Sequence, residues 1–183
     1  MKHDRSIRPC NADAGTVAMP QDEMLEAAGL GALLLEPQYV ADVRTVLTEN
    51  AFCNPENAAL YGIICRLDDK GDTPDMITVI RHAHAAGIPA DTVVGLTQTV
   101  GSGVQVFHHA QALADLERRR HMLLYARELA SRIQSGGDTD EVLEWARQEV
   151  ERFADLAVRT DEVRSIKEVL AEAIDDLERR PIV

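Results

Sequence analysis

The sequence is poor in aromatic and in basic residues. Aromatic side chains make up 4% of its 183 residues, so leucine, alanine, valine and isoleucine must fill the core. Such a mixture favours packed helices over β-sandwiches. Only 19 basic residues stand against 31 acidic ones, which gives a formal net charge of −12. Because a phosphate-binding surface normally needs a basic excess, we expect an all-α protein that is not primarily a DNA- or RNA-binding module.

The sequence also lacks the patterns of a zinc site, a leader peptide and a membrane span. Its three cysteines, Cys10, Cys53 and Cys65, are odd in number and have no CxxC spacing. This favours reduced thiols and no zinc site. The first residues carry no apolar run behind their basic residues, and no apolar stretch approaches the length of a membrane span. We expect a soluble, cytoplasmic protein with no membrane contact.

No pattern of an active site is present. None of the lysines follows a glycine-rich loop of the P-loop type, and neither GxSxG nor HExxH occurs. His82 and His84 are two residues apart, and His108 and His109 are adjacent, so the members of each pair lie on different sides of a helix. We therefore expect no catalytic residue, no metal site and no cofactor in this chain.

Breakers and changes of pattern divide the chain into four predicted segments. Residues 1–21 read as a flexible N-terminal arm, and residues 22–103 as a helical globular subdomain. Residues 104–158 read as a helical hairpin for oligomerisation or partner docking, and residues 159–183 as a linker with a terminal linker helix. Gly101-Ser102-Gly103 is the strongest breaker and marks the boundary between globule and hairpin.

Capping residues predict where the helices of the globule begin. The predicted starts lie at Asp22, Asn54-Pro55, Thr73-Pro74-Asp75 and Asp91. Gly29 and Gly31 lie inside the first of these helices, where each costs about 1 kcal/mol relative to alanine. They are unfavourable choices unless another element approaches the backbone closely.

Two long helical runs form the predicted hairpin. The first extends from Val106 to Ile133, a turn follows at Gly136-Gly137, and Asp138 with Glu141 forms a capping pattern for the second. The second run carries apolar residues at alternating steps of three and four. These residues are Leu143, Ala146, Val150, Phe153 and Ala157. Two helices joined by so short a turn pack antiparallel.

The stretch Arg118-Arg119-Arg120 is the densest positive charge of the chain. One interpretation is a solvated face that pairs with acidic residues of the return helix, such as Glu144, Glu149 and Glu151. Another is docking to an acidic patch on a second protein, because arginine favours bidentate carboxylate contacts; contact with nucleic acid is the third. Trp145, the single tryptophan, packs at the hairpin seam in one interpretation and contributes to an interface in the other.

The end of the chain predicts one more helix. Ser165 and Glu168 have the spacing of a capping box. Apolar residues then recur at steps of three and four, which places a single apolar stripe along the helix. An isolated helix of this length is marginal in water, so the stripe calls for a partner surface.

These elements, in this order, resemble the N-terminal domain of DnaB-type replicative DNA helicases. That family opens with a helix like E-x-A-V-L-G-A-L-L-L-D-P, and residues 26–37 read EAAGLGALLLEP. Residues 51–61, AFCNPENAALY, resemble D-F-Y-x-x-x-H-x-x-I-F, with Asn57 where the family usually has histidine and Cys53 where it often has tyrosine. Residues 71–79, GDTPDMITV, resemble G-x-P-I-D-x-V-T-V. The similarity spans about residues 23–180.

The resemblance implies that this chain belongs to the collar, the ring of N-terminal domains at one end of the helicase, rather than to the motor domain that hydrolyses ATP. It implies a compact all-α globule, a long antiparallel hairpin that pairs with a neighbour's hairpin, and a terminal linker helix. The collar is a homo-oligomer, a dimer or trimer of dimers and a hexamer in the full-length protein, and it docks primase and in some systems a helicase loader. The resemblance also implies that ATP, Mg and most DNA contacts belong to a RecA-like motor domain beyond Val183. The sequence would then end between the collar and this motor domain.

The resemblance also assigns two sets of interface residues. The hairpin surface for partner docking comprises Arg118, Arg119, Arg120, Leu123, Trp145 and Phe153. The linker-helix surface that packs on a neighbouring subunit comprises Ile166, Leu170, Ala173 and Leu177. Two other functions stay open at this point: the helicase-interaction domain of a primase, and a stand-alone helical adaptor.

Overall fold

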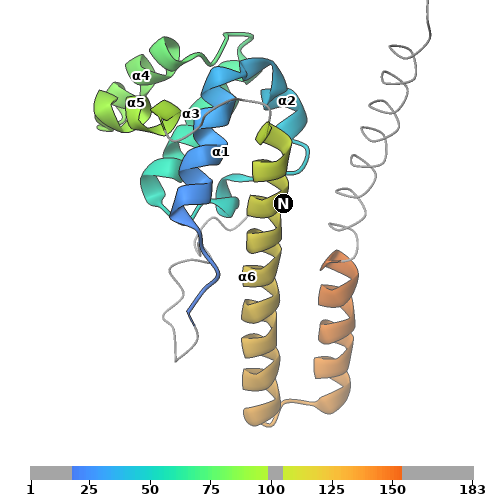
Figure 1. Cartoon of the computed structure of the whole chain (residues 1–183). Coiled ribbons are helices and arrows are strands. Elements are labelled where there is room, and N and C mark those ends of the chain that lie inside the picture. Colours follow the sequence, from blue (N-terminus) through green and yellow to red (C-terminus); the bar gives the residue numbers. More distant parts are fainter. Residues whose placement is uncertain (1–17, 99–104, 154–183) are drawn as a thin grey trace, which may run out of the picture. The chain divides into compact units, whose positions relative to one another are not determined.

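Every regular element in residues 18–98 and 105–153, which a computed structural model describes, is a helix (Figure 1). In chain order they are α1 (Glu23–Leu35), η2 (Pro37–Tyr39), α2 (Val40–Val43), η3 (Glu49–Ala51), α3 (Pro55–Asp69), α4 (Met76–Ala85), α5 (Ala90–Gln98) and α6 (Val106–Gln134). A further helix covers residues 139–153. The predicted all-α fold class is confirmed, while the predicted linker helix lies outside the described residues.

The predicted capping residues begin three of the helices. Asp22 accepts a hydrogen bond from the Leu25 amide at 2.9 Å at the start of α1. Asn54 accepts from the Glu56 amide at 2.9 Å at the start of α3, and Asp75 caps α4. Asp91 is not a cap, because α5 begins at Ala90 and Asp91 lies in its first turn.

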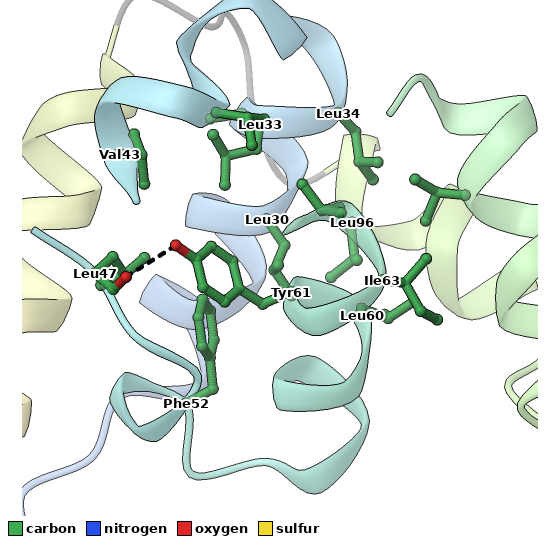
Figure 2. Close-up of a cluster of buried hydrophobic side chains, with 14 of the residues drawn as sticks. Leu30, Leu33, Leu34, Val43, Leu47, Phe52, Leu60, Tyr61, Ile63 and Leu96 are labelled. Carbon is green, nitrogen blue, oxygen red and sulfur yellow. Dashed lines mark hydrogen bonds between the residues drawn. The ribbon is translucent and has the colours of Figure 1, made fainter. Parts of the chain in front are cut away.

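The core of the first compact unit, residues 1–128, forms where α1, α3 and α5 meet. Leu30, Leu60 and Leu96 come from these three helices and point toward one another (Figure 2). The Tyr61 hydroxyl donates a hydrogen bond to the Leu47 carbonyl at 3.0 Å. Burial raises the pKa of that hydroxyl, so it remains a neutral donor inside the core.

Gly29 lets α6 approach α1 closely. A Cβ atom at Gly29 would lie 3.0 Å from the Cδ1 atom of Leu113 and 3.8 Å from the Cβ atom of His109. Leu113 is fully buried on α6. The close approach that would justify a glycine within this helix is therefore present at Gly29.

The first part of α6 belongs to the same compact unit as the globule. This unit extends through α6 to Glu128, and α6 buries Val106, Ala110, Leu113 and Ala114 in the shared core. The predicted boundary at 101–103 falls outside the described residues. The apolar face of α6 is the reason that the globule and this stretch of helix form one unit.

The second compact unit, residues 129–183, contains the end of α6 and the helix over residues 139–153. Gly136 in the connecting turn has a φ of 73°, a conformation that glycine adopts readily. Asp138 accepts hydrogen bonds from the amides of Asp140 and Glu141 at 2.9 and 3.2 Å, as its capping pattern predicts. The Arg132 guanidinium lies over the Trp145 ring, 4.4 Å from its centroid, so the two helices are in contact.

We expect Gly29→Val to lower the free energy of unfolding by about 1–3 kcal/mol, because its methyl groups would press into Leu113 and His109. Gly95→Val is the matched control, since Gly95 lies in α5 with no atom within 4 Å of an added Cβ. The control should change the free energy by less than about 1 kcal/mol. Urea unfolding followed by circular dichroism measures both, and equal losses would contradict the close approach.

Candidate functional site

The three consecutive arginines of α6 have different surroundings. Arg120 is 0% exposed. Its guanidinium donates to the carbonyls of Pro20 at 2.9 Å, Asn50 at 3.0 Å and Ala51 at 2.7 Å. Burial lowers the pKa of this guanidinium, and the nearby Glu117 and Glu26 carboxylates act in the opposite direction. Arg120 is therefore an internal support rather than a side chain that a partner contacts in this structure.

Arg118 and Arg119 remain on the outside of α6. Both lie beside Asp115 of the preceding turn, with nitrogen–oxygen distances of 3.6 Å for Arg118 and 2.7 Å for Arg119. Ion pairs this exposed contribute little to stability. These two arginines are thus accessible to a partner's carboxylate at a small cost.

The acidic residues of the helix over residues 139–153 pair within their own helix. Arg147 bonds both Glu144 and Glu151, and Arg152 bonds Glu149. Arg147 and then Gln148 lower the pKa of Glu144 to about 2. The ion pairs of these acids within the second unit therefore stabilise their own helix.

The apolar members of the predicted docking surface are half-buried. Leu123, Trp145 and Phe153 are all in this class. More exposed apolar side chains lie next to them in sequence: Leu143 is 63% and Val150 54% exposed. These two are seven residues apart on one helix, so they share a face. This exposed pair is absent from the predicted interface set.

The first unit contains a second buried charge, the carboxylate of Glu26. Glu26 of α1 is 1% exposed. It accepts hydrogen bonds from the amides of Cys53 at 2.6 Å and Asn54 at 3.1 Å. The Asn57 side-chain amide donates a third at 3.1 Å. Asn57, which departs from the family's usual histidine, is thus a partner of this carboxylate.

Sequence reasoning missed both buried charges, although one signal for Glu26 was available. Glu26 precedes Leu30 and Leu33 at steps of four and three, so it occupies the apolar stripe of α1. A charged residue on such a stripe is buried only with hydrogen-bond partners. Arg120 gave no comparable signal, because it follows the half-buried Arg118 and the exposed Arg119 in a polar stretch.

The cysteine prediction is wrong at one position. Cys53 is disulfide-bonded, whereas Cys65 is a free thiol. Burial raises the pKa of the Cys65 thiol. The number and spacing of cysteines do not reveal which of them meet in space, and this is why the prediction of reduced thiols failed for Cys53.

The described residues contain no group of three or more histidine, cysteine or acidic side chains that could hold a metal ion. The His108 and His109 rings are 6.3 Å apart between centroids. Burial lowers the pKa of His109, and His108 adds to the effect. In the part of the chain that the structure covers, no helix is both long and apolar enough to cross a membrane.

Comparison with known sequences gives one family. A family model described as the DnaB-like helicase N-terminal domain matches residues 18–115. Replicative DNA helicase DnaB of Rhodothermus marinus is 29% identical over 177 residues, which cover 94% of this chain and 19% of the relative. The corresponding protein of Treponema pallidum is 24% identical over 169 residues, which cover 88% of this chain and 38% of the relative. The chain thus spans between about a fifth and two fifths of these relatives.

Solved structures are similar over most of the chain. The N-terminal domain of DnaB helicase from Mycobacterium tuberculosis superposes with a TM-score of 0.66 at 25% identity, covering 73% of this chain and 98% of that one. A DnaB-like replicative helicase, described together with its interactions with primase, gives a TM-score of 0.61 at 19% identity. It covers 87% of this chain and 36% of that one, and at this identity the likeness shows the fold alone.

We expect Arg120→Met to lower the free energy of unfolding by at least about 3 kcal/mol, because three backbone carbonyls, one of them in a fully buried hydrogen bond, lose their charged donor. Arg119→Met is the matched control and should cost less than about 1 kcal/mol, since it breaks only an exposed ion pair. Urea unfolding of both variants tests this. Similar losses for the two would contradict the supporting role of Arg120.

The ion pair between Glu144 and Arg147 should depend on pH. The pKa of Glu144 is lowered in the folded chain from an ordinary value of 4.5 to about 2. The pair therefore stabilises the helix above about pH 4.5 and is lost as the pH falls toward 2. A carbon-detected NMR titration should show the Glu144 midpoint rising toward its ordinary value in Arg147→Gln. Arg152→Gln should leave that midpoint in place, and a shift of the same size there would refute the assignment.

Proposed function

The chain belongs to the family of DnaB-like helicase N-terminal domains, and from this premise we propose that it is the collar of a hexameric replicative helicase. As a collar it assembles the ring and docks primase and a helicase loader during DNA replication. It carries out no chemistry of its own. ATP and Mg binding, unwinding and most DNA contacts belong to a motor domain elsewhere in such a protein, and the protein works in the cytoplasm.

Ring assembly rests on the exposed apolar face of the helix over residues 139–153. Leu143 and Val150 project from this face at a heptad spacing, which suits pairing with another helix. Burying a side chain of this size contributes about 1.5–3 kcal/mol. In a two-fold dimer the same patch faces itself, so each pair of subunits would bury four such side chains. The occupant that we propose is the same helix of a second copy.

Docking of primase rests on Arg118 and Arg119 of the first unit. Arg118 and Arg119 are positively charged and accessible in a chain whose net charge is strongly negative. A partner with an acidic patch can replace Asp115 as their counterion. A DnaB-like helicase with the same fold is described with its interactions with primase, which supports primase as the occupant. Leu123, Trp145 and Phe153 supply apolar contacts for docking partners.

The linker-helix residues Ile166, Leu170, Ala173 and Leu177 lie outside the described residues. We retain for them the role that the family resemblance implies. They pack on the motor domain of an adjacent subunit and connect one subunit of the ring to the next.

The test of ring assembly is the mass of the chain in solution. We expect a dimer or larger assembly in sedimentation equilibrium, and Leu143→Glu with Val150→Glu should shift it to monomer, because four buried carboxylates would repel. Ile77→Glu is the matched control, since Ile77 is 69% exposed in the first unit, and it should leave the mass unchanged. A chain that is monomeric at high concentration would contradict the proposal.

The test of docking is binding to the C-terminal domain of the cognate primase, measured by calorimetry at low salt. Arg118→Glu with Arg119→Glu should weaken binding by about tenfold or more, because attraction becomes repulsion at two positions. Arg66→Glu with Arg81→Glu, at exposed arginines of α3 and α4, changes the net charge by the same amount and is the control. Equal binding by all variants would place primase on another surface.

A further inference from the structure

A small pocket with basic walls lies on the first unit, between α3 and α4. Its volume is about 70 Å³. Three of its lining residues are basic and none is acidic. The lining comprises Ile63, Arg66, Leu67, Lys70, His82 and Ala86. Because the chain as a whole has a net charge of −12, this pocket differs in sign from most of the protein.

Two helices bring the basic side chains of the pocket together. Arg66 lies on α3, and Lys70 follows four residues later at the end of that helix, so the two share a face. His82 reaches the same pocket from α4. The three basic residues are exposed, whereas Ile63 and Leu67 between them are buried. Charges beside such an apolar floor attract a counterion more strongly than charges in open water.

The acidic residues that precede Lys70 are bound to another side chain. Arg44 of α2 lies 2.7 Å from a carboxylate oxygen of Asp68 and 2.7 Å from one of Asp69, and these bonds raise the pKa of Arg44. Neither aspartate lines the pocket. Within residues 18–98 and 105–153, the three basic residues of the pocket form no ion pair. Their charges are therefore available to an anion.

One carboxylate lies close to the pocket without lining it. A Cβ atom added at Gly62 would lie 2.8 Å from Oε1 of Glu49 and 3.3 Å from Nη1 of Arg66. The Glu49 side chain therefore approaches Arg66 from η3. An anion in the pocket would be repelled by this carboxylate, so removal of its charge should strengthen binding.

The size of the pocket and its donors suit a single phosphate group. Since one water molecule takes about 30 Å³ of the liquid, the pocket holds a group of a few heavy atoms and no nucleobase or peptide. Arginine binds phosphate through two parallel hydrogen bonds, and lysine adds a compact charge. An imidazole N–H donates whether or not the ring is charged. Three donors from two helices match a tetrahedral phosphate better than a carboxylate, which has two oxygens.

We propose that this pocket binds a phosphate group, either as inorganic phosphate or as the phosphate monoester of a small molecule. Arg66, Lys70 and His82 bind three of its oxygens. The fourth oxygen faces solvent, where the rest of a monoester can extend. A phosphate group carries a charge of about −1.5 to −2 at pH 7, and this charge offsets the mutual repulsion of the basic residues. The inference goes beyond the collar function and does not depend on it.

Binding is tested by titrating the isotope-labelled chain with inorganic phosphate at constant pH and ionic strength, with the His82 imidazole followed by NMR. We expect a saturable shift with a dissociation constant of about 1–10 mM. Lys70→Gln should raise this constant about fivefold or more, because a charged donor is lost. Arg81→Gln is the matched control, since Arg81 is exposed on α4 outside the pocket lining, and it should change the constant less than about twofold. Glu49→Gln should lower the constant.

Two further probes distinguish the source and the class of the ligand. Adenosine monophosphate that binds with the same dependence on Lys70 would identify a phosphate monoester as the ligand. Binding of inorganic phosphate alone would identify the free ion. Acetate that binds as tightly as phosphate, a lack of saturation with both phosphate probes, or equal losses in Lys70→Gln and Arg81→Gln would overturn the proposal.

Discussion

Residues 50–54 are held between two buried charges of opposite sign, and the first unit depends on this arrangement. Arg120 of α6 donates to the carbonyls of Asn50 and Ala51. Glu26 of α1 accepts from the amides of Cys53 and Asn54. Each charge is thus satisfied mainly by backbone dipoles rather than by the other charge. Desolvating two ions is costly, so this arrangement survives only with all of its hydrogen bonds in place, and it fixes α1, α6 and the start of α3 against one short segment.

This support also positions the surfaces that we assign to partners. Because the side of α6 that carries Leu113 and Arg120 is buried in the first unit, Arg118 and Arg119 are left on the accessible side. Gly29 contributes by removing the side chain that would otherwise separate α1 from α6. In the second unit, the contact between Arg132 and Trp145 occupies one side of the helix over residues 139–153. Leu143 and Val150 lie outside that contact and remain exposed.

Local patterns predicted most of the secondary structure because their causes are local. Asp22 and Asn54 cap helices by bonding amides two or three residues away, and such bonds depend on little beyond the neighbouring sequence. The alternating steps of the hairpin stripe likewise follow from helix geometry. Asp91 failed as a cap because α5 begins one residue earlier, a difference that composition does not reveal. The role of Arg120 could not be predicted, since its three acceptors are distant in sequence.

The sequence by itself determined that the chain is helical, where its main helices begin, and which family it resembles. These follow from capping, periodicity and motif order, which act over a few residues. Only the tertiary structure decided which arginine of Arg118-Arg119-Arg120 is buried, that Glu26 is its counterpart across residues 50–54, and that Cys53 is bonded while Cys65 is free. Burial and pairing depend on which distant segments meet, and that is set by packing of the whole unit rather than by any stretch of sequence alone.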